Sequence, residues 1–145
     1  RYDIKTGSVN KHLEQMILKT IAAFSNAQGG TLIMGITDEQ EIVGLEQDYQ
    51  TFNNGTKDEF ELHIRNLTNN AYGVEFSSNN LDISFPICED TEICVIEIKP
   101  WNKPLYTMVK DSNGVKSEKF YLRNGNSSPE LPTSELASYI NSRFS

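Results

Sequence analysis

The sequence predicts a single α+β domain in which a mixed β-sheet with β-hairpins packs against about three helices. Three segments place apolar residues at three- and four-residue spacing, which indicates helices with one buried face. Between them lie short apolar runs bounded by glycine, proline and asparagine, as is typical of strands. A length of 145 residues suits one hydrophobic core. We therefore treat residues 1–145 as one domain, and the start at Arg1 rather than methionine predicts that it was cut from a longer protein.

The first predicted helix covers residues 9–27 and ends at two glycines. Its apolar positions are Val9, Leu13, Met16, Ile17, Ile21 and Phe24. Gly29 and Gly30 supply the left-handed backbone that closes a helix without a Cβ clash. The β-rich run 31–36 follows at once, and after the polar turn 37–40 the run 41–45 is apolar again. This pattern predicts a helix that feeds a β-hairpin.

The second predicted helix begins at a capping box formed by Thr56 and Glu59. One face would carry Phe60, Ile64, Leu67 and Ala71, and Asn69, Asn70 and Gly73 would end the helix. The alternating run 81–85 and the denser run 93–98 then predict a second antiparallel hairpin. Beyond the prolines at 100 and 104, we expect a short aromatic strand at 119–123 and a last helix capped by Thr133.

Composition excludes several classes of protein. The net charge of −7 and the pI near 4.8 argue against a general polyanion binder, so any nucleic-acid contact must come from a local patch. No apolar run approaches the roughly 18 residues that a membrane-spanning helix needs, and the first residues lack the apolar stretch of a signal peptide, so a cytoplasmic location is expected. Cys88 and Cys94 lie in apolar surroundings and are predicted to be buried thiols. His12 and His63 fall on different predicted helices without a nucleophile motif, so acyl transfer is not indicated.

The glycines at 29 and 30 resemble a phosphate-binding loop only superficially. Phosphate loops run from a strand into a helix N-terminus, whereas this one leaves a helix C-terminus, where the dipole is negative. No GxxxxGK[ST] motif occurs. We interpret the two glycines as a structural helix stop.

Four acidic residues form a candidate metal site. Converging carboxylates can hold a divalent ion for phosphodiester hydrolysis. The same residues at a hairpin tip also suit solvated turn formers, and sequence alone leaves both readings open. The four are Asp3, Asp38, Glu39 and Glu41.

Residues 120–128, FYLRNGNSS, form the candidate nucleic-acid site. Arg123 ends a strand beside a loop whose Asn124, Asn126 and Ser127 are small hydrogen-bonding side chains, an arrangement that suits a phosphate oxygen. The nearby lysines are Lys99, Lys103, Lys110, Lys116 and Lys119. The alternative is a solvated strand edge on which lysines discourage edge pairing. Trp101 could stack on a base, or pack at a sheet edge.

Four segments in this order resemble the Schlafen/AlbA-type nucleic-acid-binding domain family, formerly labelled ATP-binding. They are DIK at 3–5, AFSNAQGGTLIMGI at 23–36, IVGL at 42–45 and FYLRNGNSS at 120–128. The resemblance covers nearly the whole chain and implies an α+β domain of larger bacterial proteins, DNA-binding or regulatory in role, such as transcriptional regulators. The ATP-binding label finds no support, because no Walker lysine is present.

In the vertebrate Schlafen branch the resemblance implies a metal-dependent endoribonuclease with three acidic residues, two of them in a Glu-x4-Glu element. Asp3 resembles the second acid and Asp38 the third, while the first would precede Arg1. A pair reduced to Asp3 and Asp38 would hold Mg²⁺ or Mn²⁺ poorly. Three hypotheses follow: a non-enzymatic nucleic-acid-binding regulatory module bound through Arg123, Asn124, Asn126, Ser127, Lys119 and Lys103; a ribonuclease that uses Asp3, Asp38 and Mg²⁺ or Mn²⁺; and a protein-interaction or homo-oligomerisation domain.

Overall fold

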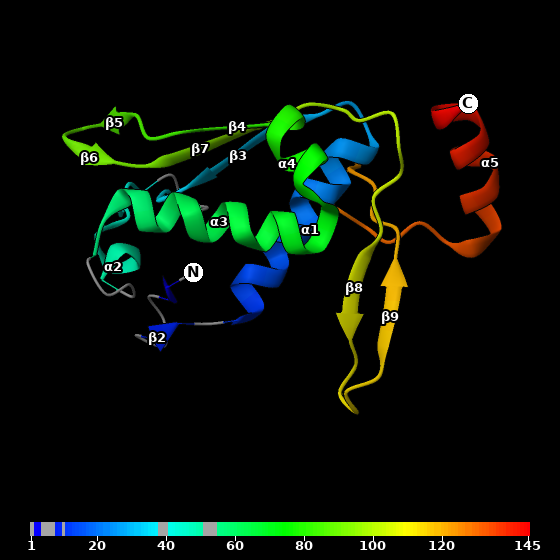
Figure 1. The fold of residues 1–145 in the computed structure, drawn as a ribbon, viewed down its shortest axis with the longest axis horizontal. Coiled ribbons are helices and arrows are strands. Elements are labelled where there is room, and N and C mark those ends of the chain that lie inside the picture. Colours follow the sequence, from blue (N-terminus) through cyan, green and yellow to red (C-terminus); the bar gives the residue numbers. More distant parts are fainter. Residues whose placement is uncertain (1, 4–7, 10, 38–40, 51–54) are drawn as a thin grey trace.

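The computed structural model describes residues 2–3, 8–9, 11–37, 41–50 and 55–145, and confirms the α+β class. Two short strands, β1 (Tyr2–Asp3) and β2 (Ser8–Val9), precede α1 (Lys11–Asn26). The remaining elements are shown in Figure 1. They are β3 (Gly30–Met34), α2 (Glu46–Tyr49), α3 (Lys57–Tyr72), α4 (Val74–Asn80), β4 (Leu81–Ser84), β5 (Ile87–Cys88), β6 (Thr91–Glu92), β7 (Cys94–Ile98), β8 (Thr107–Lys110), β9 (Lys116–Lys119) and α5 (Thr133–Phe144).

The core lies between the central sheet and the helices α1 and α3. The sheet has the strand order β3-β7-β4, and Leu32 and Ile83 both lie opposite Ile96. Because side chains alternate along a strand, these three residues share one face, and they pack with Ile21 of α1 and Ile64 of α3. The expected mixed sheet is corrected in one respect, because every ladder among the described residues is antiparallel.

Both glycines after α1 are required by the geometry, as the sequence predicts. Gly29 has a φ of +81°, and a Cβ there would lie 2.5 Å from the carbonyl oxygen of Ile98. A Cβ on Gly30 would lie 2.3 Å from the ring of Phe24. The N–H of Gly29 donates to the Phe24 carbonyl at 2.8 Å and closes the helix. The chain therefore passes directly from α1 into β3.

The predicted hairpin at 31–45 is wrong in its second strand. Ile36 and Ile42 form only an isolated antiparallel bridge, and the N–H groups of Val43 and Gly44 both donate to the Gly35 carbonyl. Gly44 then turns the chain with a φ of +73° and Leu45 is buried at the start of α2. The strand β3 pairs with β7 instead, because that long-range partner completes the sheet over the core.

The capping box and the second antiparallel pairing are confirmed. The Thr56 hydroxyl accepts from the Glu59 N–H at 3.2 Å, and α3 starts at the next residue after Thr56. Gly73, with a φ of +93°, leads into α4, a helix that the sequence analysis missed. The strands β4 and β7 pair as predicted, and the small β5–β6 hairpin joins them at the far end of the sheet.

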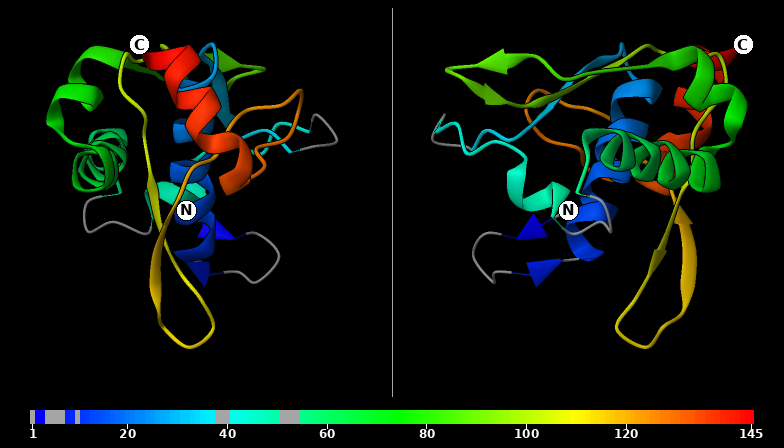
Figure 2. Two further views of the ribbon diagram at one scale, coloured as in Figure 1. Left: turned by 90° about the vertical axis from the view of Figure 1, so that its right-hand side faces the viewer. Right: turned by 60° about the vertical axis from the view of Figure 1, so that its left-hand side comes forward.

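The strand expected at 119–123 lies earlier in the chain, at Lys116–Lys119, where it is the second strand of a hairpin. The strands β8 and β9 form a two-stranded antiparallel ribbon that projects from the body of the domain (Figures 1 and 2). We call residues 107–119 the ribbon. Its strand β9 ends at Lys119, and Tyr121 makes only a bridge to Glu130.

The last helix, α5, begins at Thr133 with Pro132 in the capping position, one residue earlier than expected. Its side chains are at most half-buried, so polar bonds attach it to the domain. The Tyr139 hydroxyl donates to the Asn26 carbonyl, and Arg143 donates to the carbonyls of Ser25 and Ala27. These acceptors are the free carbonyls at the C-terminal end of α1, where a cation is favoured by the helix dipole.

Both cysteines are free thiols, as predicted. Cys94 is fully buried in the core, and burial raises the pKa of its thiol to about 12, whereas Cys88 is half-buried. In the described ranges, no helix combines the length and apolar character required to cross a bilayer.

Candidate nucleic-acid interface

The segment after the ribbon is held along α1 by one buried amide. The Asn26 side chain donates to the carbonyls of Leu105 and Tyr121, at 3.0 and 2.9 Å, and accepts from the Leu105 N–H at 2.8 Å. Asn26 is completely buried, so these bonds have no competition from water. The Arg123 N–H donates to the Ala23 carbonyl at 3.1 Å. Residues 121–123 therefore lie in a fixed position against the helix.

This placement creates two cation–aromatic pairs on one surface. The Lys19 ammonium lies 4.9 Å from the centre of the Tyr121 ring, and the Arg123 guanidinium lies 4.7 Å from the centre of the Phe24 ring. All four side chains are half-buried. Because the pairs join the same segment to the same helix, we name Lys19, Phe24, Tyr121 and Arg123 the cation–aromatic face. An aromatic ring attracts a cation but does not neutralise it.

The charges of this face are not compensated within the described part of the chain. Neither Lys19 nor Arg123 has a carboxylate within ion-pair distance there. Two other lysines proposed from the sequence differ, because Lys119 pairs with Glu130 at 3.3 Å and Lys103 with Glu75 at 3.9 Å. The cation–aromatic face therefore offers positive charge to an external anion.

Arg123 also makes contacts within the protein. Its Nε donates to the Gly125 carbonyl at 2.9 Å and its Nη1 to the Ser128 hydroxyl at 3.1 Å. Arg123 thus braces the loop 124–128, and its contact with phosphate stays a prediction. The Ser127 hydroxyl is also engaged, donating to the Asn124 carbonyl at 3.0 Å. The side-chain amides of Asn124 and Asn126 are exposed, and no protein partner for them is seen among the described residues.

The structure does not bring Lys103 together with this loop. Lys103 lies 5.2 Å from the centre of the Trp101 ring and pairs with α4. Trp101 packs against Phe76 with ring centres 5.4 Å apart, which supports the packing interpretation over base stacking. The basic patch predicted from sequence therefore divides into separate pieces, of which the cation–aromatic face is one and the ribbon another.

The acidic candidates fall largely outside the described residues. Asp3 belongs to β1, where its backbone pairs with Ser8, but its side chain is not described. Asp38 and Glu39 also lie outside the described residues, and Glu41 is exposed with its N–H on the Thr37 hydroxyl. Within the part of the chain that is described, no group of three or more acidic, histidine or cysteine side chains could hold a metal. The metal site stays a prediction.

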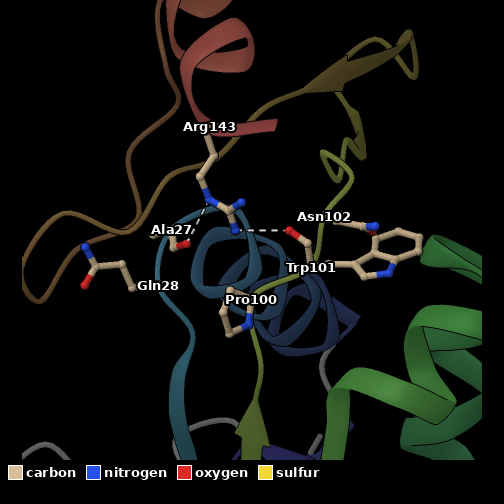
Figure 3. Close-up of a pocket in the computed structure, with 6 residues that line it drawn as sticks. All are labelled: Ala27, Gln28, Pro100, Trp101, Asn102 and Arg143. Atoms are coloured by element: carbon tan, nitrogen blue, oxygen red, sulfur yellow. Dashed lines mark hydrogen bonds between the residues drawn. The ribbon is translucent and has the colours of Figure 1, made fainter. Parts of the chain in front are cut away.

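A surface hollow of about 440 Å³ lies where α5 meets the end of α1 (Figure 3). The Arg143 side chain enters it and donates to the carbonyls of Ala27 and Trp101, at 3.2 and 3.0 Å. The Trp101 ring points away from the guanidinium, which lies 4.5 Å from the centre of the Phe144 ring. Because Arg143 is engaged with backbone carbonyls, we interpret the hollow as a consequence of α5 docking.

Sequence reasoning missed two members of the cation–aromatic face, Lys19 and Phe24. Lys19 and Tyr121 are far apart in the sequence, so no local sequence pattern predicts their contact. Phe24 was expected to be a core residue. It is half-buried against the core, and its ring contacts both Gly30 and Arg123.

Comparison with known proteins places this geometry in a family. No curated protein matches the chain. Among solved structures, the DIP2311 protein from Corynebacterium diphtheriae matches with a TM-score of 0.60 and 18% sequence identity. The match covers 94% of this chain but only 23% of that protein, and at such identity it shows a shared fold alone. The family model described as Schlafen, AlbA_2 matches residues 1–132. The chain therefore belongs to the Schlafen AlbA_2 family.

Proposed function

We propose that this domain is a nucleic-acid-binding module whose cation–aromatic face contacts the phosphate backbone. The observation that carries the proposal is the presence of two cations, Lys19 and Arg123, without carboxylate partners among the described residues of a chain with a net charge of −7. Membership of a family associated with nucleic acids supports the same conclusion. A regulatory role in a larger cytoplasmic protein is a further prediction.

The geometry of the cation–aromatic face favours phosphate binding. It holds the two cations in place and leaves nearby side-chain amides available as hydrogen-bond donors. A lysine on an aromatic ring has lost part of its side-chain freedom before an anion arrives, so less entropy is lost on binding. Beside it, the exposed amides of Asn124 and Asn126 are held on a loop that Arg123 braces. Amide and backbone N–H groups commonly complete phosphate contacts made by cations. Because the chain as a whole is acidic, binding should depend on its local cationic surfaces and be sensitive to salt.

The test is the variant Lys19→Gln, measured by fluorescence anisotropy against single- and double-stranded DNA and RNA at low salt. Loss of one phosphate contact should weaken binding and reduce the slope of log K against log[salt] by about 0.7 for single strands or about 0.9 for duplexes. The matched control is Lys99→Gln, which also removes one positive charge but from a lysine paired with Asp82.

Two results would contradict the proposal. One is the absence of binding to every nucleic acid at low salt, and the other is an equal effect of Lys19→Gln and Lys99→Gln. Asn126→Asp offers an independent check, because it adds a negative charge on an exposed side chain without removing a hydrogen bond within the described residues. It should weaken binding while leaving the melting temperature unchanged.

A further inference from the structure

The ribbon carries an unfavourable arrangement of charge at its far end. The register of β8 and β9 places Lys110 directly opposite Lys116, at the last pair before the turn. Side chains opposite each other in an antiparallel pair have their Cβ atoms about 4.5 to 5.5 Å apart, and like charges there are destabilising. Both lysines are exposed, and neither has an ion-pair partner in the part of the chain that is described.

The turn offsets this repulsion only in part, because among the described residues its one carboxylate forms no ion pair with either lysine. The carboxylate of Asp111 is adjacent, but its Oδ1 accepts from the N–H groups of Asn113 and Val115, at 2.8 and 2.9 Å. Glu118 lies opposite Met108, two pairs closer to the body of the domain, and no ion pair joins it to either lysine. A fold that holds two lysines together at an exposed tip gains stability when an external anion lies between them.

The shape of the ribbon restricts what that anion can belong to. From Lys110 to Glu118 every residue is exposed, so the two strands stand free of the body (Figure 2). The B-form major groove is about 12 Å wide and admits a two-stranded β-ribbon. The major groove of A-form RNA is deep and narrow and side chains cannot read it. A free ribbon with a cationic tip therefore fits duplex DNA.

The distance between the tip and the cation–aromatic face agrees with this fit. At about 3.3 Å per residue for an extended chain, the segment from Lys116 to Tyr121 spans at most roughly 16 Å. That separation is comparable with the width of one major groove. We propose that the ribbon enters the major groove of B-form DNA, with Lys110 and Lys116 on the phosphates of one strand and the cation–aromatic face on the other. This inference rests on the proposed function and names duplex DNA as the nucleic acid.

The experiment compares the 145-residue protein with the double variant Lys110→Gln/Lys116→Gln. The probes are a DNA duplex of about 20 base pairs, the RNA duplex of the same sequence and each single strand. For duplex DNA, the slope of log K against log[salt] should be smaller by about 1.8 in the double variant, at about 0.9 per phosphate contact. Extrapolated from 1 M to about 0.1 M salt, this corresponds to roughly a 60-fold rise in Kd. Its melting temperature should be no lower than that of the wild type, because the repulsion is removed.

Glu118→Gln is the matched control on the same ribbon, because it removes a negative charge and should tighten binding to duplex DNA. Equal affinity for duplex RNA or a preference for single strands overturns the inference, as does wild-type binding of duplex DNA by the double variant. If Lys19→Gln weakens binding and the ribbon variants do not, the ribbon inference fails and the proposed function stands. If no probe is bound, both fail.

Discussion

Replacing Asn26 by alanine is expected to cause a large loss of stability, because one side chain satisfies three buried backbone groups. The amide donates to the carbonyls of Leu105 and Tyr121 and accepts from the Leu105 N–H. Removing it leaves these groups without their partners in a site that excludes water, at about 1 to 1.5 kcal/mol each. The sum is about 3 to 4.5 kcal/mol, a large fraction of the roughly 5 to 15 kcal/mol by which a domain is stable.

The free energy of unfolding is measured by urea denaturation at neutral pH, with Asn126→Ala as the control. Asn126 is exposed, so its variant should lie within about 0.5 kcal/mol of the wild type. An Asn26→Ala variant with an unchanged m-value and a loss below about 1 kcal/mol would refute the reasoning, since it would mean that water or a rearranged loop replaces the amide.

Two further predictions concern a buried thiol and the acidic candidates. The folded pKa of Cys94, about 12, lies above its unfolded value near 9, so the native state retains a proton that the unfolded state releases. The stabilisation from the neutral thiol is complete below about pH 9 and is lost as the pH rises towards 12. Cys94→Ala should therefore reduce the slope of unfolding free energy against pH in this window by up to about 1.4 kcal/mol per unit, and identical slopes would disprove the assignment. For the ribonuclease alternative, we expect no Mn²⁺-dependent cleavage of tRNA by this chain, because Asp3 and Asp38 alone form a weak metal site. Cleavage that disappears in Asp38→Ala would establish that alternative.

Local signals in the sequence located the features whose partners lie close in the chain. The capping box of Thr56 and Glu59 spans a single helical turn, so the sequence contains both partners. The helix stop at Gly29 and Gly30 also follows from backbone sterics that only glycine satisfies. In each case the interacting residues are close together in the sequence, so a local pattern predicts the structure.

The errors arose where distant segments decide the structure. The run 41–45 has the composition of a strand, but β3 takes β7 as its partner. Between residues 35–37 and 41–44 the structure shows an isolated bridge and a few backbone hydrogen bonds rather than a second strand. The ribbon was missed because β9 reads Lys-Ser-Glu-Lys, with no apolar alternation, and residues 116–118 are all exposed. The Asn113-Gly114 pair was its only strong turn signal.

The candidate site also combines features that local sequence predicts with contacts that depend on distant segments. Arg123 and its loop were identified from composition, but the roles of these residues depend on contacts across the fold. Arg123 braces the loop because Phe24 and Ser128 lie beside it, and Lys19 joins the face only because residues 121–123 run along α1. No spacing of residues in the sequence predicts the contact between α1 and residues 121–123.

The buried amide of Asn26 also links the two proposed contacts with DNA. Leu105 lies two residues before β8 and Tyr121 two residues after β9, so the Asn26 side chain holds both ends of the ribbon at its base. Tyr121 is also a member of the cation–aromatic face. The direction of the ribbon relative to that face is therefore set by one fully buried side chain on α1. An uncharged amide does not titrate, so we expect the relative position of the two surfaces to be unaffected by pH across the neutral range.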